Sequence, residues 1–203
     1  TFAANANFST PGTFDCEFGV TLACDSNALN DSQALQVVNA TSVSTFPYFQ
    51  NFEAANFWQA GGAGSWAEGT PSANVINAAY SGTTSWATNL TGNHSANEYS
   101  WVESPFFNLS TLTAPVVEFK MWYEIHTAYA DGVCLQYTTD GGATWQHVGI
   151  GLGALTGDPN GDNWYNTMSI EGLLFYNGWA GSTSGYQTMK YFLYGTNAIT
   201  NLA

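Results

Sequence analysis

The sequence predicts an all-β protein, because strand and turn signals recur along the whole chain. Residues 137–145 are expected to form a strand, an Asp-Gly-Gly turn and a returning strand that ends in Trp145. Glycine tolerates the positive φ that hairpin turns need, and the Asp140 side chain can accept hydrogen bonds from the turn amides. Residues 116–124 alternate between apolar and mixed side chains, as a half-buried strand does. Many short segments of this kind between Gly, Asn and Pro turns indicate a β-sandwich.

The first expected element is a strand over residues 12–24. Its even-numbered positions share one face and carry Phe14, Cys16, Phe18, Val20, Leu22 and Cys24. Cys16 and Cys24 would lie about 26 Å apart at roughly 3.3 Å per residue, far beyond the ~7 Å Cα limit for a disulfide. We therefore expect Cys16, Cys24 and Cys134 to be buried free thiols. A strand that folds back at Gly19, with a Cys16–Cys24 bridge, is the alternative.

A second strand at 34–39 is expected to return antiparallel to the first, after the turn cluster at 25–32. Two strands alone are marginal in water, so this hairpin must be the end of a larger sandwich or pack on the next part of the chain. Residues 40–45 read as a linker. From Phe46 a new pattern begins, with a first strand at 46–53, then an exposed Trp58 and a glycine-rich loop to Gly64. Later strands are expected at 75–78, 84–89, 99–104, 116–125, 133–138, 145–148 and 188–194.

The composition argues against binding of polyanions by charge. Two Lys or Arg residues stand against fifteen Asp or Glu residues, which gives a formal net charge of −13. Such a chain has no electrostatic hold on nucleic acid or anionic lipid. We therefore expect no nucleic-acid partner. No apolar run approaches the ~20 residues of a membrane span, so we also expect no membrane insertion. Only 8% of the residues are charged and 16% are aromatic, as in many secreted β-proteins.

A series of ordered motifs runs from residue 46 to residue 190. They are FPYFQNFE at 46–53, SWAEGTP at 65–71, VIN at 75–77, SGT at 81–83, WATNLTGN at 86–93, SPFF at 104–107 and DGVCLQY at 131–137. In this order they resemble the MAM-like jelly-roll domains of very large, repeat-built surface proteins of Bacteroidetes. The next motif, Thr-x-Asp-x-Gly-x-x-Trp, is formed by Thr138, Asp140, Gly142 and Trp145 and matches the Asp-box, a hairpin that holds a turn together. A ligand or metal role for Asp140 is the alternative.

The N-terminal hairpin has a resemblance of its own. Pro11 to Phe14 open a strand and Asn30 to Ser32 close a loop before the last strand, which is similar to the end of a CARDB-type immunoglobulin-like repeat. The two resemblances imply the end of an Ig-like β-sandwich at 1–42, followed by a MAM-like jelly-roll β-sandwich at 46–203 that lacks its last strand. The leading strands of the first sandwich are also missing. We therefore expect a segment of a longer protein.

The MAM-like resemblance implies a non-catalytic extracellular role. Proteins built this way include gliding and attachment adhesins secreted by the type IX route, whose partners are glycans, abiotic or cell surfaces and neighbouring repeats. The same module is also appended to secreted peptidases and glycosidases, so an accessory carbohydrate-binding module is the alternative. We expect no catalytic residues. His-Glu-x-x-His, Gly-x-Ser-x-Gly and phosphate-binding loop motifs do not occur in the sequence. Glu124 and His126 share a strand face and could approach an acid–base pair, but a solvent-facing strand pair explains them as well. Glu98 and Glu103 flank an aromatic strand, and a glycosidase needs two carboxylates roughly 5–10 Å apart across a sugar-sized cleft, which does not follow from the sequence.

The same resemblance implies a structural calcium ion near the first strand. The matching positions are Asn51 and Glu53, with oxygens around Ser81 and Thr84, and hard oxygen ligands suit Ca²⁺. A Glu53 that merely caps a strand end is the alternative. The segment 157–163 also places oxygens at alternate positions, but it lacks the glutamate that a calcium loop needs, so we expect a turn there.

Aromatic side chains supply a second candidate site. The chain carries eight Trp residues, and exposed aromatic faces can stack on sugar rings, although most large aromatics pack in cores. Trp164, Tyr165, Trp179 and Tyr186 lie in segments rich in Gly, Asn and Ser. We expect these four side chains to contact a glycan.

Overall fold

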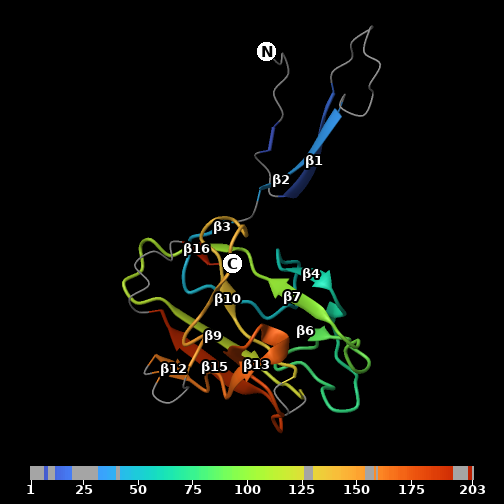
Figure 1. Ribbon diagram of the computed structural model, residues 1–203, viewed down its shortest axis with the longest axis vertical. Helices are drawn as coiled ribbons and strands as arrows, with labels where there is room; N and C mark the ends of the chain where they lie inside the picture. The colour runs from blue at the N-terminus through green and yellow to red at the C-terminus, as the bar shows by residue number, and fades with distance from the viewer. Residues whose placement is uncertain are drawn as a thin grey trace. The chain divides into compact units, whose positions relative to one another are not determined.

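The protein is all-β, built from antiparallel strands with only a short 3-10 helix among the described residues (Figure 1). The computed structural model describes residues 7–8, 12–19, 32–39, 42–125, 130–153, 158, 160–193 and 201–202. The chain divides into two compact units, Thr1–Ser42 and Val43–Ala203, and the predicted linker at 40–45 spans this division. Within the described part of the chain, no helix is long and apolar enough to cross a membrane.

The first unit contains the predicted antiparallel hairpin, formed by β1 (Gly12–Gly19) and β2 (Ser32–Asn39). Cys16 lies opposite Leu35, and the ring of Phe8 meets that of Phe14 edge-on, with centroids 5.2 Å apart. Cys16 is a free thiol, but it is half-buried rather than buried, because Leu35 opposite it is itself 54% exposed. Cys24 and the predicted continuation of β1 beyond Gly19 lie outside the described residues.

The remaining strands are short. In chain order they are β3 (Ser42–Val43), β4 (Gln59–Ala63), β5 (Trp66–Gly69), β6 (Ser85–Thr88), β7 (Tyr99–Glu103), β8 (Phe106–Asn108), β9 (Val116–Met121), β10 (Gln136–Tyr137), β11 (Gln146–His147), β12 (Gly161–Asp162), β13 (Thr167–Ile170), β14 (Tyr176–Gly178), β15 (Gln187–Phe192) and β16 (Asn201–Leu202). The 3-10 helix η2 (Glu171–Leu173) lies between β13 and β14. The strand orders within sheets are β12-β15-β9, β16-β8-β3, β4-β7, β5-β6, β10-β11 and β13-β14.

The core of the second unit lies on the inner face of β15 and β9. The alternation predicted for residues 116–124 matches the structure, since Met189 pairs with Phe119 and Tyr191 with Val117 on the apolar face. Two clusters of buried side chains form there: Leu109, Val148, Tyr191 and Leu193, and Tyr123, Tyr165, Trp179 and Met189. The outer face carries Glu118, Lys120 and Lys190. Figure 1 shows β4 and β7 on a different side of the unit from β9 and β15.

Three expectations about strands are wrong. Residues 46–53 are not a strand, because the side chains of Gln50 and Asn51 accept hydrogen bonds from the amides of Phe52 and Glu53 and Phe52 has a φ of 62°. Residues 75–78 form bends rather than a strand. The expected glycine-rich loop after Trp58 is strand β4, and Trp58 is half-buried, since its indole N–H donates to the Tyr48 hydroxyl.

Candidate functional site

The β4–β7 pair carries exposed aromatic side chains on one face. Tyr99, Trp101 and Glu103 occupy alternate positions of β7, so their side chains share that face. The register places Gly61 opposite Trp101 and Gln59 opposite Glu103, and directly opposite residues share a face as well. We call Gln59, Tyr99, Trp101 and Glu103 the aromatic surface.

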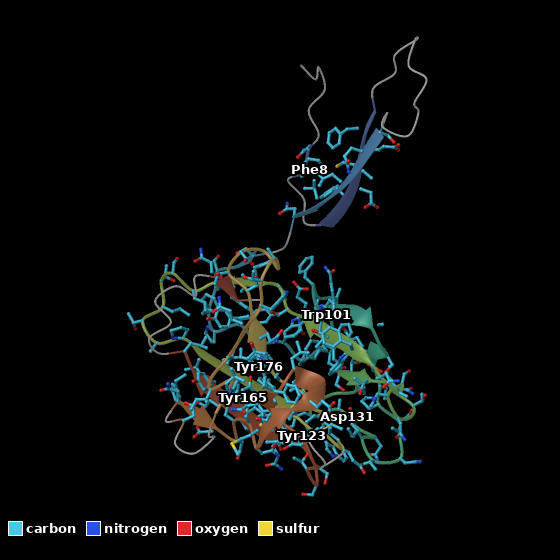
Figure 2. All side chains as sticks on the ribbon, in the orientation of Figure 1. Phe8, Trp101, Tyr123, Asp131, Tyr165 and Tyr176 are labelled. Carbon is cyan, nitrogen blue, oxygen red and sulfur yellow. The ribbon has the colours of Figure 1, made fainter. Side chains whose placement is uncertain are left out.

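Trp101 lies against the backbone of β4, and glycine makes this possible. A Cβ atom on Gly61 would lie 2.6 Å from Cε2 and Nε1 of the indole, and one on Gly62 would lie 2.7 Å from its Cζ3. No real Cβ is tolerated at such distances, so both positions need glycine for the indole to lie where it does. One side of the Trp101 ring is therefore supported by main chain. Figure 2 labels Trp101 beside β7, apart from the core residues Tyr123 and Tyr165.

The aromatic surface faces solvent and ends in a carboxylate. Tyr99 is 67% exposed and Trp101 is 43% exposed, and their rings meet at 72° with centroids 6.2 Å apart. Burial raises the pKa of Glu103, and a hydrogen bond from the Trp101 side chain to its carboxylate offsets part of that effect. The indole thus lies against the glycines of β4, with the Glu103 carboxylate two positions along the same face.

Glu98, which precedes β7, has an internal role. Its carboxylate accepts hydrogen bonds from the amide and hydroxyl of Ser65 at 2.9 and 2.7 Å, the amide of Ser95 at 3.1 Å and the hydroxyl of Ser100 at 2.7 Å. Burial raises the pKa of Glu98, but these hydrogen bonds outweigh burial and lower it to about 2. The carboxylate holds the segment after β4 against the start of β7. It therefore helps to position the aromatic surface.

The residues predicted to bind calcium are partly brought together. Oε1 of Glu53 accepts hydrogen bonds from the amides of Thr83 and Thr84 at 2.8 and 2.7 Å, and Oε2 accepts one from the Thr83 hydroxyl at 3.1 Å. The two backbone hydrogen bonds lower its pKa. The loop after Ser81 therefore presents hydrogen-bond donors to this carboxylate. Asn51 accepts from the Glu53 amide at 3.3 Å. No group of three or more His, Cys, Asp or Glu side chains within the described ranges forms a metal cluster.

The predicted Asp-box residues lie in one turn between β10 and β11. The Thr138 hydroxyl donates to Asp140 at 2.7 Å and accepts from the Gly142 amide at 2.9 Å. Asp140 accepts from the hydroxyl and the amide of Thr144 at 2.6 and 2.9 Å, and these bonds lower its pKa to about 2. Gly141 and Gly142 have positive φ, and Trp145 is 38% exposed. This geometry supplies every partner that a turn-holding role requires.

The expectation that Tyr165 and Trp179 contact a glycan is wrong, because both side chains are buried. Trp164 stays a predicted contact, since part of its side chain is exposed. Trp179 is 1% exposed and Tyr165 is 5% exposed, and both lie in a core cluster. Trp164 is half-buried between the two clusters, with its ring centroid 5.0 Å from that of Trp179. Each side chain uses its polar group internally: Trp164 donates to the Val148 carbonyl, Trp179 to the Asn163 carbonyl and Tyr165 to the Leu135 carbonyl. These aromatic side chains pack in the core although their neighbours in the sequence are polar.

The fourth predicted aromatic, Tyr186, keeps contact with solvent. Its hydroxyl donates to the Ala78 carbonyl at 3.0 Å, and its ring meets those of Tyr80 and Trp122 edge-on. Tyr80 is 58% exposed, and the Lys120 ammonium lies 5.3 Å from its ring centroid. This cluster is a second aromatic area on the surface.

The thiol of Cys134 has little nucleophilic character. Burial raises the pKa of the free thiol of Cys134 to about 12, and burial lowers the pKa of the neighbouring His147. The two groups lie 3.9 Å apart, and the His147 ring stacks on Tyr176. A protonated thiol beside a neutral imidazole is a packing arrangement and no activated nucleophile. His126, the predicted partner of Glu124, lies outside the described residues.

The sequence-based selection of aromatics does not include Tyr99 and Trp101. They alternate with Ser100 and Val102, so a strand with an aromatic face is recognisable from the sequence. The missing signal is the partner strand. The stretch Gly61–Gly62 favours a loop when read locally, whereas in β4 these glycines make room for the indole. Comparison of the chain with known family models, with curated proteins and with solved structures gives no match.

Proposed function

We propose that this chain is a non-catalytic, extracellular segment of a large cell-surface adhesin or filament protein that acts in surface attachment or gliding. The observation that carries the proposal is the aromatic surface. Two large aromatic side chains, Tyr99 and Trp101, are held exposed on a strand whose partner is glycine at the point of contact. Keeping them exposed forgoes burial of apolar area, which a ligand would recover. Stacking on a glycan or contact with an abiotic or cell surface supplies such a ligand.

The resemblance of residues 46–190 to MAM-like jelly-roll domains supports this proposal. With a CARDB-type immunoglobulin-like end at 1–42, the chain matches the order found in type IX secretion cargo of Bacteroidetes. Neighbouring repeats of the same protein are then further partners, and a structural calcium ion at Asn51, Glu53, Ser81 and Thr84 belongs to the same proposal. The low charge, with 8% charged residues, suits an extracellular protein that contacts uncharged surfaces.

An accessory carbohydrate-binding module of a secreted hydrolase or peptidase is the second candidate, and the aromatic surface favours it equally. The two roles share the binding step and differ in what the parent protein contains. Tandem repeats next to this segment in the parent sequence support the adhesin, and a catalytic domain supports the module.

The test is binding of the purified chain to a glycan array and to coated surfaces. We expect a signal for the wild type that is lost in Tyr99→Ala/Trp101→Ala. The matched control is Tyr80→Ala/Trp145→Ala, which removes two exposed aromatics outside the aromatic surface and should keep the signal. A wild type that binds nothing would contradict the proposal, and so would a signal that the control variant loses and the Tyr99/Trp101 variant keeps.

A further inference from the structure

The groups of the aromatic surface favour a positively charged ligand over a negatively charged one. Its polar groups are the carboxylate of Glu103 and the amide of Gln59, which lie opposite each other in the register. Its apolar groups are the rings of Tyr99 and Trp101, whose π faces carry the negative end of the aromatic quadrupole. Every one of these groups tolerates or attracts a cation, and the carboxylate repels an anion.

The distribution of charge over the chain points the same way. The chain has only two Lys or Arg residues, Lys120 and Lys190, against fifteen Asp or Glu. Both lysines lie on the outer face of β9 and β15, on a different side of the second unit from β4 and β7 (Figure 1). A net charge of −13 adds a field that attracts cations to any site without a local positive charge.

The geometry of Trp101 fits a flat ring as the ligand. The main chain of Gly61 and Gly62 covers one side of the indole. The Tyr99 ring meets the indole at 72°, with centroids 6.2 Å apart. Glu103 follows Trp101 by two positions on the same face of β7, so a ligand ring stacked on the free side of the indole brings its substituents near this carboxylate.

The carboxylate has acceptor capacity left for such a substituent. An ionised carboxylate offers about four acceptor positions, more than the single N–H of the neighbouring Trp101 can fill. Glu98, five positions earlier, has its oxygens engaged with Ser65, Ser95 and Ser100 and contributes nothing to a ligand. Glu103 is thus the acidic group of this strand that a ligand can use.

We propose that the aromatic surface selects amino sugars: pyranose rings that stack on Trp101 while a protonated amine binds the Glu103 carboxylate. This inference rests on the proposed contact with glycans and adds the class of sugar. Neutral pyranoses bind by stacking alone and more weakly. Acidic sugars such as uronates are excluded by Glu103. The preference weakens as salt screens the ion pair, whereas the stacking contribution does not.

The experiment compares three tetrasaccharides that differ in charge: β-1,4-linked glucosamine, its N-acetylated form and galacturonate. Isothermal titration calorimetry of the full chain with each tetrasaccharide measures the affinities. The titrations are made at about pH 6, where amines of this kind are protonated. We expect the glucosamine tetramer to bind about tenfold more tightly than the N-acetylated one, from an exposed ion pair and a cation–π contact, and the galacturonate tetramer not to bind. Raising the salt should narrow the difference.

Two variants at the carboxylate test the assignment. Glu103→Gln should abolish the preference and leave the affinity for the N-acetylated tetramer within about twofold, since Gln keeps an acceptor for the indole N–H. Gln59→Glu, at an exposed position opposite Glu103, should increase the preference and does not depend on Glu103→Gln being stable. Glu118→Gln, on the outer face of β9, is the matched control and should change nothing.

The outcomes separate the two proposals. Equal binding of the glucosamine and N-acetylated tetramers, or a preference that survives Glu103→Gln, overturns the amino-sugar inference and leaves glycan contact intact. Binding of galacturonate overturns it too. Competition by tetramethylammonium as effective as by the glucosamine tetramer makes this a site for simple cations and overturns the sugar part. The absence of binding by every tetramer overturns the inference; absence on the glycan array and coated surfaces as well overturns the proposed function.

Discussion

Carboxylates act as internal acceptors at three turns of this protein. Glu53 holds the amides of Thr83 and Thr84, Glu98 holds Ser65, Ser95 and Ser100, and Asp140 holds Thr144. Each lowered pKa means that the ionised form is bound better in the folded state than in the unfolded one. Their contributions are therefore present above the unfolded pKa and are lost as the pH falls.

We expect Glu98→Gln to lower the free energy of unfolding at neutral pH by about 1–2 kcal/mol, after allowance for solvent screening of a carboxylate near the surface. Because the folded-state pKa of about 2 lies below the ordinary value of 4.5, the wild type loses this advantage between these two pH values. The variant and the wild type should then converge in acid. Urea unfolding at both ends of this range is the measurement, with Glu171→Gln as an exposed control. A constant difference at all pH values would show that the charge is not responsible.

Glu53→Ala separates the hydrogen-bonding role from the calcium role. We expect the variant to melt at a lower temperature than the wild type in the presence of a chelator, because its loop loses the hydrogen bonds to Thr83 and Thr84 under all conditions. A calcium ion at this carboxylate would add an increment by mass action that chelation removes from the wild type and that the variant lacks. Thermal melts of both proteins with calcium and with chelator measure the two contributions separately.

At the scale of elements, the packing of β4 on β7 requires that β4 has no side chain at Gly61. A Cβ on Gly61 would overlap the indole of Trp101 at 2.6 Å, and the ring would have to leave its place above the backbone. The glycine at position 61 thus determines both the packing of this pair and the position of the indole on the aromatic surface.

Gly61→Ala should cost about 1–3 kcal/mol of stability, as overpacking does, and should weaken glycan binding together with it. The control is Gly92→Ala, where the nearest atom to a new Cβ, Nδ2 of Asn89, lies 3.4 Å away. The indole N–H resonance of Trp101 in an NMR spectrum reports whether the ring has moved. An unshifted resonance in a stable Gly61→Ala protein would contradict the proposed support by β4.

How far the sequence predicts these elements depends on the distance between partners. The Asp140 turn is predictable because its partners, Thr138 and Thr144, lie within four positions. The partner of Glu98 is Ser65, 33 positions away, and no local pattern indicates such a pair. Strand β4 is not predicted for the same reason. Its glycines favour a loop when read locally, and the contact with Trp101 that explains them lies far away in the sequence. The burial of Trp179 is also not predicted, because its neighbours in the sequence are polar and favour an exposed loop, whereas residues distant in the sequence pack around the ring.

At the scale of the whole molecule, the buried core belongs to the second unit. Among the described residues, the buried apolar side chains run from Pro71 to Leu193 in the chain, and none lies in Thr1–Ser42. Compact units with their own core commonly fold alone. The first unit, by contrast, is a hairpin whose Phe18 and Leu35 are exposed.

We therefore expect a fragment of residues 42–203, which keeps β3 whole, to fold without the rest of the first unit. It should melt within about 2 °C of the full chain, because a larger shift would require the loss of a sizeable fraction of 1 kcal/mol of stability. Circular dichroism melts of the two proteins are the measurement. Glycan binding by the fragment should equal that of the full chain, since the aromatic surface lies within 59–103. A fragment that fails to fold would place part of the stability in the first unit.

The support of Trp101 by glycine also makes the aromatic surface traceable through evolution. In a related chain, a side chain at position 61 and an indole of residue 101 in this position exclude each other, so we expect the two sites to change together. A homologue that keeps both should keep the ligand, and one that has lost Gly61 should have replaced the indole and the ligand with it. A pair of glycines in one strand with Tyr-x-Trp-x-Glu in its partner is therefore a fingerprint by which this surface can be sought in other sequences.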